Sequence, residues 1–275
     1  WLEATELSGT ADLLLRLKGK YIASTNTAPD LACDINIING YINHRKSPVA
    51  ASNLLLDLHV KMPSLDTDSL DIRLDTLNCN IGKDFIKGKL AVKGLKRPFI
   101  SANINTQVDL QQLGRTLGIS GIDMRGRLIS HISANGRFDA DTKTFPVATA
   151  AIDLQNGQLK TNYYPNPIEK INIKANLSNP TGNFKDLTVN ILPCSVYFEK
   201  QPFFVQASLQ NFENIVYDIR AKGQLDVSRI YKVFSREGLK LDGFVSADLS
   251  LKGNQNDAVN GQYDKLNNSG TLTLK

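Results

Sequence analysis

The sequence predicts a mainly β protein: elongated, curved antiparallel sheets built from tandem repeats of about 117 residues, with one short helix per repeat. The sheets are expected to form either a β-groove or a sandwich-like arrangement. Two observations support this prediction. Apolar and polar residues alternate along most of the chain, which is the pattern of strands with one apolar face and one wet face. The chain also matches itself at an offset of 117 residues, as stacked repeat proteins do.

The repeat is most visible in the glycines. Twelve glycines lie early enough in the chain to be tested at this offset, and six of them fall on another glycine, whereas chance predicts about one. Three of the five testable prolines also find a partner. The matching glycine pairs are Gly9 with Gly126, Gly19 with Gly136, Gly40 with Gly157, Gly121 with Gly238, Gly126 with Gly243 and Gly136 with Gly253.

These matches divide the chain into units. We expect one elongated array over 1–275, with units at 1–121 and 122–238 and the start of a third unit at 239–275. The stretch LSGTADLLLRLKGK (7–20) opens the first unit, and it returns as MRGRLISHISANGR (124–137) and LDGFVSADLSLKGN (241–254). Between about 76 and 107 the sequence match slips by a few residues. The repeat therefore predicts a sheet that continues from one unit into the next.

Individual strands follow from the alternation. Runs of about eight residues, separated by Gly, Pro, Asn and Asp, imply antiparallel strands joined by tight turns. Strands are predicted over 53–61, 70–78, 88–94, 171–178, 187–192 and 244–253. Two segments, 108–118 and 225–235, instead place an aspartate before apolar residues at helical spacing, which predicts a short capped helix in each.

Composition excludes several classes of protein. The net charge of +5 is spread along the chain, unlike the basic stripe of a nucleic-acid binder, so no nucleic-acid partner is expected. No apolar run approaches the ~18 residues of a membrane span. Because the chain begins with Trp1, we expect it to be a segment of a longer protein. Cys33, Cys79 and Cys194 have no CxxC spacing; buried free thiols are favoured over a Cys33–Cys79 bridge.

No catalytic or metal-binding motif is present in the sequence. His44, His59 and His131 lack metal-ligand spacing and are interpreted as solvent-facing strand or turn residues. The acidic stretch 139–145 is interpreted as a β-turn, since it lacks the glycine and the terminal glutamate of a calcium loop. Aromatic residues gather in 162–165, 196–204 and 212–217, where core packing or groove lining is favoured over base or sugar stacking. We therefore expect a protein that is not an enzyme and needs no cofactor or metal.

The alternating frame resembles the AsmA family of Gram-negative envelope proteins, which also includes TamB-like proteins. The resemblance rests on IKGKLAVKGLKRPFISANINTQVDLQQLG (86–114), on the recurring LxLKG frame, and on KGNQNDAVNGQYDKLNNSGTLTLK (252–275). It implies a repeating β-groove in the periplasm, anchored in the inner membrane by a helix outside this segment. It also implies a phospholipid or other acyl-chain ligand, a role in phospholipid transport and outer-membrane assembly, and outer-membrane assembly proteins as partners.

An apolar sheet face must curl on itself, pair with a second sheet or hold an apolar ligand. Twelve residues are predicted to form a lipid-binding groove wall, with a closed sandwich core as the alternative. They are Leu54, Leu56, Leu58, Ile72, Leu74, Leu90, Val92, Ile171, Ile173, Val189, Ile191 and Val205. Two other functions stay open: a structural or adhesive cell-surface β-repeat protein without lipid, and a carbohydrate-binding module or enzyme that uses Tyr163, Tyr164 and Phe203.

Overall fold

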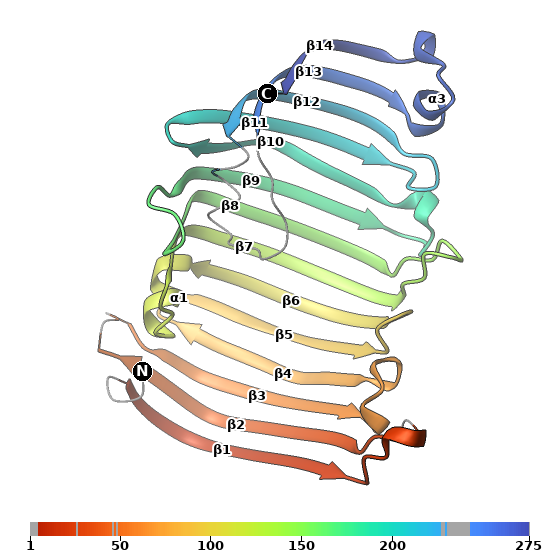
Figure 1. Cartoon of the computed structure of the whole chain (residues 1–275). Coiled ribbons are helices and arrows are strands. Elements are labelled where there is room, and N and C mark those ends of the chain that lie inside the picture. The colour runs from red at the N-terminus through yellow and green to blue at the C-terminus, as the bar shows by residue number, and fades with distance from the viewer. Residues whose placement is uncertain are drawn as a thin grey trace.

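The computed structural model describes residues 5–25, 27–45, 47, 49–226, 229 and 243–274. These residues form one antiparallel sheet of fourteen strands, each paired with its neighbours in sequence (Figure 1). The strands are β1 (Thr5–Lys18), β2 (Asp30–His44), β3 (Ala51–Met62), β4 (Asp71–Ile81), β5 (Asp84–Lys93), β6 (Phe99–Asp109), β7 (Ile122–Arg137), β8 (Val147–Thr161), β9 (Ile168–Asn179), β10 (Thr188–Phe198), β11 (Gln201–Gln210), β12 (Val216–Asp226), β13 (Phe244–Asn254) and β14 (Asn267–Leu274).

The sheet is open and curved, so the predicted mainly β class is confirmed. Its strands run in simple up-and-down order from β1 at one edge to β14 at the other, and the whole sheet bends into a trough (Figure 1). The sandwich-like version of the prediction is wrong for the described residues, because a second sheet does not pack against the first. Short turns between antiparallel neighbours produce this meander directly.

Cross-strand pairing sorts the side chains into an apolar face and a polar face. One row of directly paired residues crosses thirteen strands with only apolar side chains or glycine. The row is Ala11, Ile37, Leu56, Leu77, Gly88, Ile104, Ile132, Ala150, Leu177, Val189, Leu209, Tyr217 and Gly253. The neighbouring row on the opposite face reads Asn78, Lys87, Asn105, His131, Ala151, Asn176, Asn190, Ser208, Asp218, Lys252 and Asn267.

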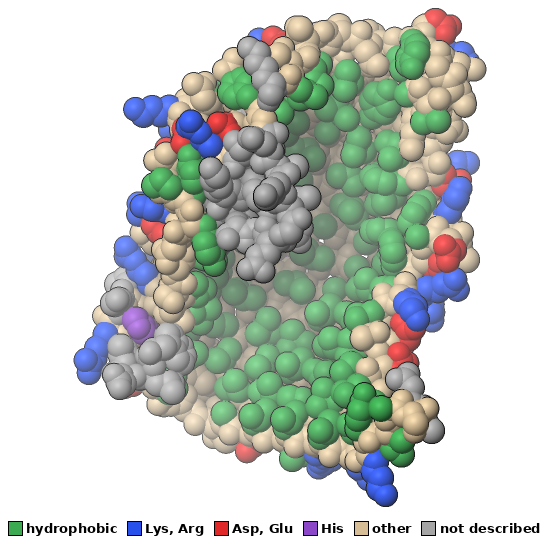
Figure 2. All heavy atoms as spheres, in the orientation of Figure 1, with side chains coloured by type: hydrophobic (Ala, Val, Ile, Leu, Met, Phe, Trp, Pro, Cys, Tyr) green, Lys and Arg blue, Asp and Glu red, His purple; other side chains and the backbone are tan. Residues whose placement is uncertain are grey.

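The apolar face lines the hollow of the trough. Figure 2 shows hydrophobic side chains covering the concave surface from one edge of the sheet to the other, with charged side chains along both rims. Because successive side chains of a strand point to opposite faces, the polar rows belong to the outer surface. Alternation in the sequence thus becomes an apolar groove with a polar outside.

Fully buried side chains are few among the described residues. Two small core clusters lie at the ends of strands. The first contains Ala51, Cys79 and Ile81, and the second contains Ile168 and Phe198. A single sheet has no second layer to cover its apolar face, so most apolar side chains of the groove stay partly accessible.

The first predicted helix is confirmed and the second lies mostly outside the described residues. Helix α1 (Leu110–Thr116) begins where the Asp109 carboxylate accepts a hydrogen bond from the Gln112 backbone N–H at 2.8 Å. Asp226 accepts the equivalent bond from the Arg229 N–H at 3.1 Å. Of the predicted helix over 225–235, only residues 225, 226 and 229 are among the described residues. A further short helix, α3 (Gln255–Val259), was not expected from the sequence.

Strand positions follow the same spacing as the sequence match. Adding 117 to the bounds of β2, β3, β4, β5 and β6 gives the bounds of β8, β9, β10, β11 and β12 without a shift. The slip expected between about 76 and 107 is therefore not seen in the strands. The register of these strands depends only on the alternation of apolar and polar residues, so residue identities can differ between matching strands while the strand positions stay the same. The division into units at 1–121, 122–238 and 239–275 stays a prediction.

Candidate functional site

The groove is the candidate site, and the twelve predicted wall residues lie on its apolar face. For ten of them, this placement follows from direct cross-strand pairing with other residues of the apolar face. Examples are Leu58 with Leu74, Leu74 with Leu90, and Ile72 with Val92. On the second half of the sheet, Val189 and Ile191 pair with Leu177 and Ala175, and Val205 pairs with Cys194. The sequence pattern therefore assigned one face consistently.

The remaining two wall residues, Leu54 and Ile171, sit at matching irregularities of the sheet. Leu54 pairs with Gly40 and Ile171 pairs with Gly157, next to shifts in register. A Cβ atom placed on Gly40 would lie 2.9 Å from the Leu54 Cβ, and one placed on Gly157 would lie 2.9 Å from the Ile171 Cβ. Only glycine fits there, so each irregularity lets a large wall residue fill the space above a glycine.

Accessibility distinguishes a groove from a core. None of the twelve predicted wall residues belongs to the buried set, and Ile173 is 36% exposed. At the first edge of the sheet the apolar side chains are far more exposed, with Leu13 at 70% and Leu15 and Leu17 at 66% each. A closed sandwich core would bury these side chains, so the alternative of a closed core is wrong for the described residues.

Sequence reasoning missed part of the wall. Ile100, Ala102 and Ile104 of β6 pair with the apolar faces of β5 and β7 and continue the groove across the middle of the sheet. The signal was available, since FISANINTQ (99–107) alternates from Ile100 onward. Small residues such as Ala102 weaken the alternation when strands are judged one at a time.

Charged side chains along the rim form a network of surface ion pairs. Arg97 contacts Asp139 at 3.3 Å and Asp141 at 2.9 Å, between the β5–β6 turn and the β7–β8 turn. Burial raises the pKa of Asp139, but hydrogen bonds from the Thr142 and Asp141 backbone N–H groups, together with Arg97, outweigh it and hold that pKa below its ordinary value. The 139–145 stretch is a turn, as predicted, closed by paired Asp139 and Thr144.

At the opposite rim, Asp84 ties helix α1 to the sheet. Its carboxylate accepts a hydrogen bond from the Asp109 backbone N–H at 2.6 Å and pairs with Arg127 at 3.1 Å. Buried Thr116 at the end of α1 donates to the Val49 carbonyl at 2.9 Å. These contacts fix α1 against one margin of the groove and leave the floor between the rims apolar.

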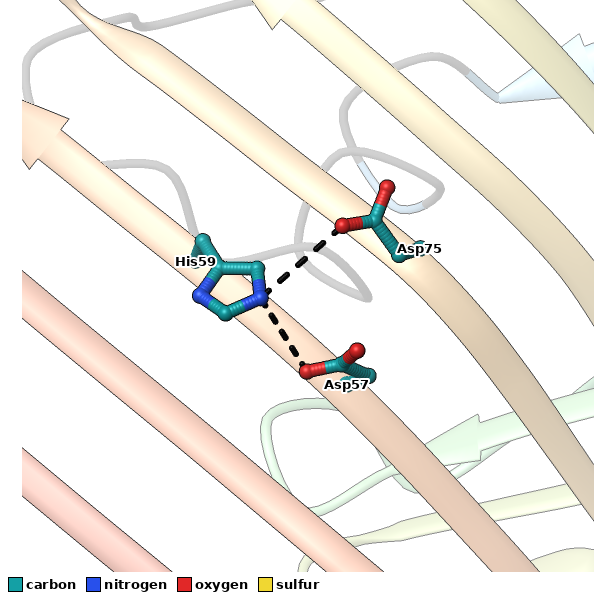
Figure 3. Close-up of side chains that lie close together, drawn as sticks. All are labelled: Asp57, His59 and Asp75. Atoms are coloured by element: carbon teal, nitrogen blue, oxygen red, sulfur yellow. Dashed lines mark ion pairs between the residues drawn. The ribbon is translucent and has the colours of Figure 1, made fainter.

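A histidine surrounded by carboxylates lies on the polar outer face of β2, β3 and β4. His59 Nδ1 is 2.7 Å from Asp34 Oδ1. Its Nε2 is 3.1 Å from Asp57 and 3.8 Å from Asp75 (Figure 3). The hydrogen bond to Asp34 is the main cause that raises the pKa of His59, and it lowers the pKa of Asp34. Asp57, His59 and Asp75 could supply ligand atoms to a divalent cation from the outer surface.

The other histidines differ from one another. His131 is a solvent-facing strand residue, as predicted, and its Nδ1 lies 2.7 Å from the Asn105 side-chain oxygen. His44 is buried at the end of β2, so its assignment to a solvent-facing position is wrong. A position at the end of a strand beside a packed helix loses the simple alternation of faces.

The three thiols are free. Cys33 and Cys194 are half-buried and Cys79 is buried, so the favoured assignment of free thiols is confirmed, and full burial holds for Cys79 alone. Burial raises the pKa of both Cys79 and Cys194, which keeps these thiols protonated and unreactive at neutral pH. Cys33 and Cys79 belong to β2 and β4, with β3 between them.

Aromatic residues divide between the two faces. Phe198 is buried in the second core cluster against Tyr164, as the core-packing interpretation requires. Phe203 pairs with Val196 and Gly223 on the groove face, while Phe204 is 44% exposed on the opposite face beside Tyr197. Tyr163 lies exposed in the turn after β8.

Comparison with protein-family models, with curated proteins and with solved structures finds no match. The resemblance to the AsmA family therefore stays a prediction. None of the helices formed by the described residues has the length and apolar character needed to cross a bilayer.

Proposed function

We propose that this chain is a non-enzymatic lipid-handling segment that holds acyl chains along the concave apolar face of its sheet. The observation that carries the proposal is the row of thirteen apolar or glycine positions that crosses the sheet from β1 to β13 without a charged residue. An apolar surface of this extent, open to solvent and bordered by polar rims, is the mark of a binding surface rather than of a folding core.

The free energy of transfer favours a hydrocarbon ligand. Each methylene group that leaves water for an apolar surface contributes roughly 0.8 kcal/mol, so an acyl chain along the groove gains several kcal/mol before entropic costs. The ligand also shields the groove side chains, which a single-layer sheet cannot cover by itself. The charged side chains lie along the rims, so a polar headgroup placed at a rim stays in contact with water while the acyl chain lies on the apolar floor.

The AsmA-like resemblance supplies the cellular setting of the proposal. A groove open along one side suits the movement of phospholipid across the periplasm, with the longer protein anchored in the inner membrane and its partners among outer-membrane assembly proteins. A structural or adhesive β-repeat protein without lipid cargo is the competing function. The two differ in one measurable property, which is whether acyl chains bind to the concave face.

The test compares two substitutions at neighbouring positions of the same strand. Ile132 of β7 lies on the apolar face and Ser133 lies on the outer face. Ile132→Asp places a charge in the middle of the groove floor, whereas Ser133→Asp places the same charge in solvent. We expect a fluorescent fatty acid to bind the unmodified chain and the Ser133→Asp variant alike, with at least about tenfold weaker binding to Ile132→Asp.

Native mass spectrometry of the purified chain gives an independent measurement, because co-purified phospholipid appears as added mass. Circular dichroism of both variants controls for folding. If neither phospholipid nor the fluorescent fatty acid associates with the folded unmodified chain, the lipid-handling function is wrong and the structural function takes its place.

A further inference from the structure

Strand β1 is an edge strand of the sheet that the described residues form, and the apolar side chains on its groove face are among the most exposed of the groove. Among the described residues it pairs with β2 alone, through residues 5–8 and 10–18. Leu13 is 70% exposed, and Leu15 and Leu17 are 66% exposed. A long edge strand with exposed apolar side chains is a template for pairing with another strand.

The sequence of β1 is self-complementary about Leu14, because charged residues of opposite sign and apolar residues lie at equal distances on either side of it. In the stretch GTADLLLRLKG (9–19), Asp12 and Arg16 are symmetric about this centre, as are Leu13 and Leu15. Ala11 is symmetric with Leu17, and the glycines at 9 and 19 mark both ends. Residues equidistant from Leu14 differ by an even number of positions, so each symmetric pair lies on one face of the strand.

We propose that two copies of this chain pair through β1, antiparallel and centred on Leu14. In this register Asp12 of each copy lies opposite Arg16 of its partner, which gives two ion pairs on the outer face. On the groove face, Leu13 lies opposite Leu15 twice and Ala11 lies opposite Leu17 twice. A two-fold interface requires a surface that complements itself, and β1 meets this requirement in both charge and apolar pattern.

The pattern is absent from the strand that matches β1 in the sequence repeat and from the other edge of the described sheet. Strand β7, which begins 117 residues after β1, carries Ile129 and Ser133 at the positions of Asp12 and Arg16. β7 is already paired on both sides, with β6 and β8, so it has no open edge at which a second copy could pair. The other free edge, β14, reads NNSGTLTL and has no charged residue that could pair with Asp12 or Arg16.

The two-fold arrangement joins the two grooves. Its symmetry axis is perpendicular to the sheet at Leu14, so the apolar faces of both copies lie on the same side. The pairing therefore produces one sheet of twice the strand number with a continuous apolar floor, and it shields Leu13, Leu15 and Leu17 from water. This inference does not depend on lipid binding, because the dimer is defined by β1 alone.

Charge exchange tests the pairing. We expect the chain to sediment as a dimer at micromolar concentration in low salt. Asp12→Arg places arginines opposite each other at both symmetric positions and weakens the dimer by about tenfold or more. The double variant Asp12→Arg with Arg16→Asp restores opposite charges and should restore the dimer. Thr271→Arg, on the free edge of β14, serves as the matched control and should leave the dimer unchanged.

A symmetric disulfide tests the register. Cα atoms of directly opposed residues lie about 4.5–5.5 Å apart, within disulfide range, so Leu14→Cys should give a covalent dimer under mild oxidation. Asp12→Cys lies four residues from its own copy, about 13 Å, and should not. A folded monomer at all concentrations, no rescue by the double variant, or loss of association in Thr271→Arg would each overturn the proposal. Chains of more than two copies would instead indicate β1–β14 pairing.

Discussion

The two core clusters occupy matching places in the sheet but are filled differently. Ile81 at the end of β4 and Phe198 at the end of β10 are 117 residues apart, and they are 1% and 2% exposed. Their strand neighbours match in the same way, Ala51 with Ile168. Among the described residues, the first cluster also contains Leu113 of helix α1, and the second has a larger central pair and also contains Tyr164.

The difference shows what the fold demands at this place. Both clusters lie at the rim that carries α1, and each fills the space where one strand begins and the next strand ends with apolar volume. Among the described residues, a helix supplies part of this volume at the first place and larger residues supply it at the second. A change of side-chain size at the two places should therefore have unequal consequences for stability.

Truncation of the two central residues gives the largest expected effect. Phe198→Ala should lower the free energy of unfolding by about 3–5 kcal/mol, because it removes the larger side chain and leaves a cavity that two strands cannot close. Ile81→Ala should cost less, about 2–4 kcal/mol, since Leu113 of α1 can shift toward the space. Urea unfolding followed by circular dichroism measures both.

An equal or larger loss at Ile81 would break the comparison, because it would mean that α1 does not adapt. The conservative variants Phe198→Leu and Ile81→Val serve as controls. Each keeps most of the side-chain volume, so each should recover most of the stability if the cavity is the cause.

The sheet could be predicted from the sequence because alternation is a local property. Leu58, Leu74 and Leu90 were predicted to share one face because every second residue of a strand faces the same way, and for the same reason they lie on the groove face. The His59 cluster could not be predicted in the same way. Asp34, His59 and Asp75 come from three strands, and only the register of β2, β3 and β4 brings them together.

Whether the apolar face is open or closed also lay beyond the sequence. A sandwich and a groove need the same alternation in each strand, and they differ only in whether a second layer covers Leu56 or Ile173. The bend of the sheet depends on irregularities such as those at Gly40 and Gly157. Their glycines were detected as repeated positions, but their pairing partners appear only in the fold.

A second comparison of matching positions concerns Gly9 and Gly126, which have the same φ of 113°. A Cβ atom added to Gly9 would lie 2.8 Å from the nearest backbone atoms of the neighbouring strand, and one added to Gly126 would lie 2.7 Å from them. Gly126→Ala should cost about 2–3 kcal/mol, because β7 is held between two strands and cannot move aside. Gly9→Ala should cost about 1 kcal/mol, since the free edge strand β1 can shift. Thermal and urea unfolding of both variants measure the difference.

Equal costs for the two alanine variants would show that β1 is held as firmly as an internal strand. Such a result, obtained at a concentration where the chain is dimeric, would be consistent with pairing through β1. Repeating the measurement with the Asp12→Arg variant as the background then separates an intrinsic property of the strand from an effect of the second copy.

The smallest expected effect concerns pH and again compares matching positions. His59 and Asp34 have Asn176 and Ala151 as their counterparts 117 residues later, so the charged pair belongs to one half of the sheet only. The pKa of His59 lies above its ordinary value of 6.5, and that of Asp34 lies below its ordinary value of 3.8. The histidine contribution to stability is complete below about pH 6.5 and is lost as the pH rises through the raised pKa. The aspartate contribution is present above about pH 3.8 and is lost as the pH falls through the lowered pKa.

The pair therefore stabilises the fold most between these two ordinary values. NMR titration of the His59 ring should give a midpoint above 6.5, and Asp34→Asn should lower that midpoint, because the carboxylate is the main cause of the shift. Since the groups are accessible to water, high salt should reduce the difference between the two proteins. A midpoint that Asp34→Asn leaves unchanged would assign the shift to Asp57 and Asp75 instead. The ion pairs that shift the pKa of His59 would then involve β3 and β4 only, and not β2.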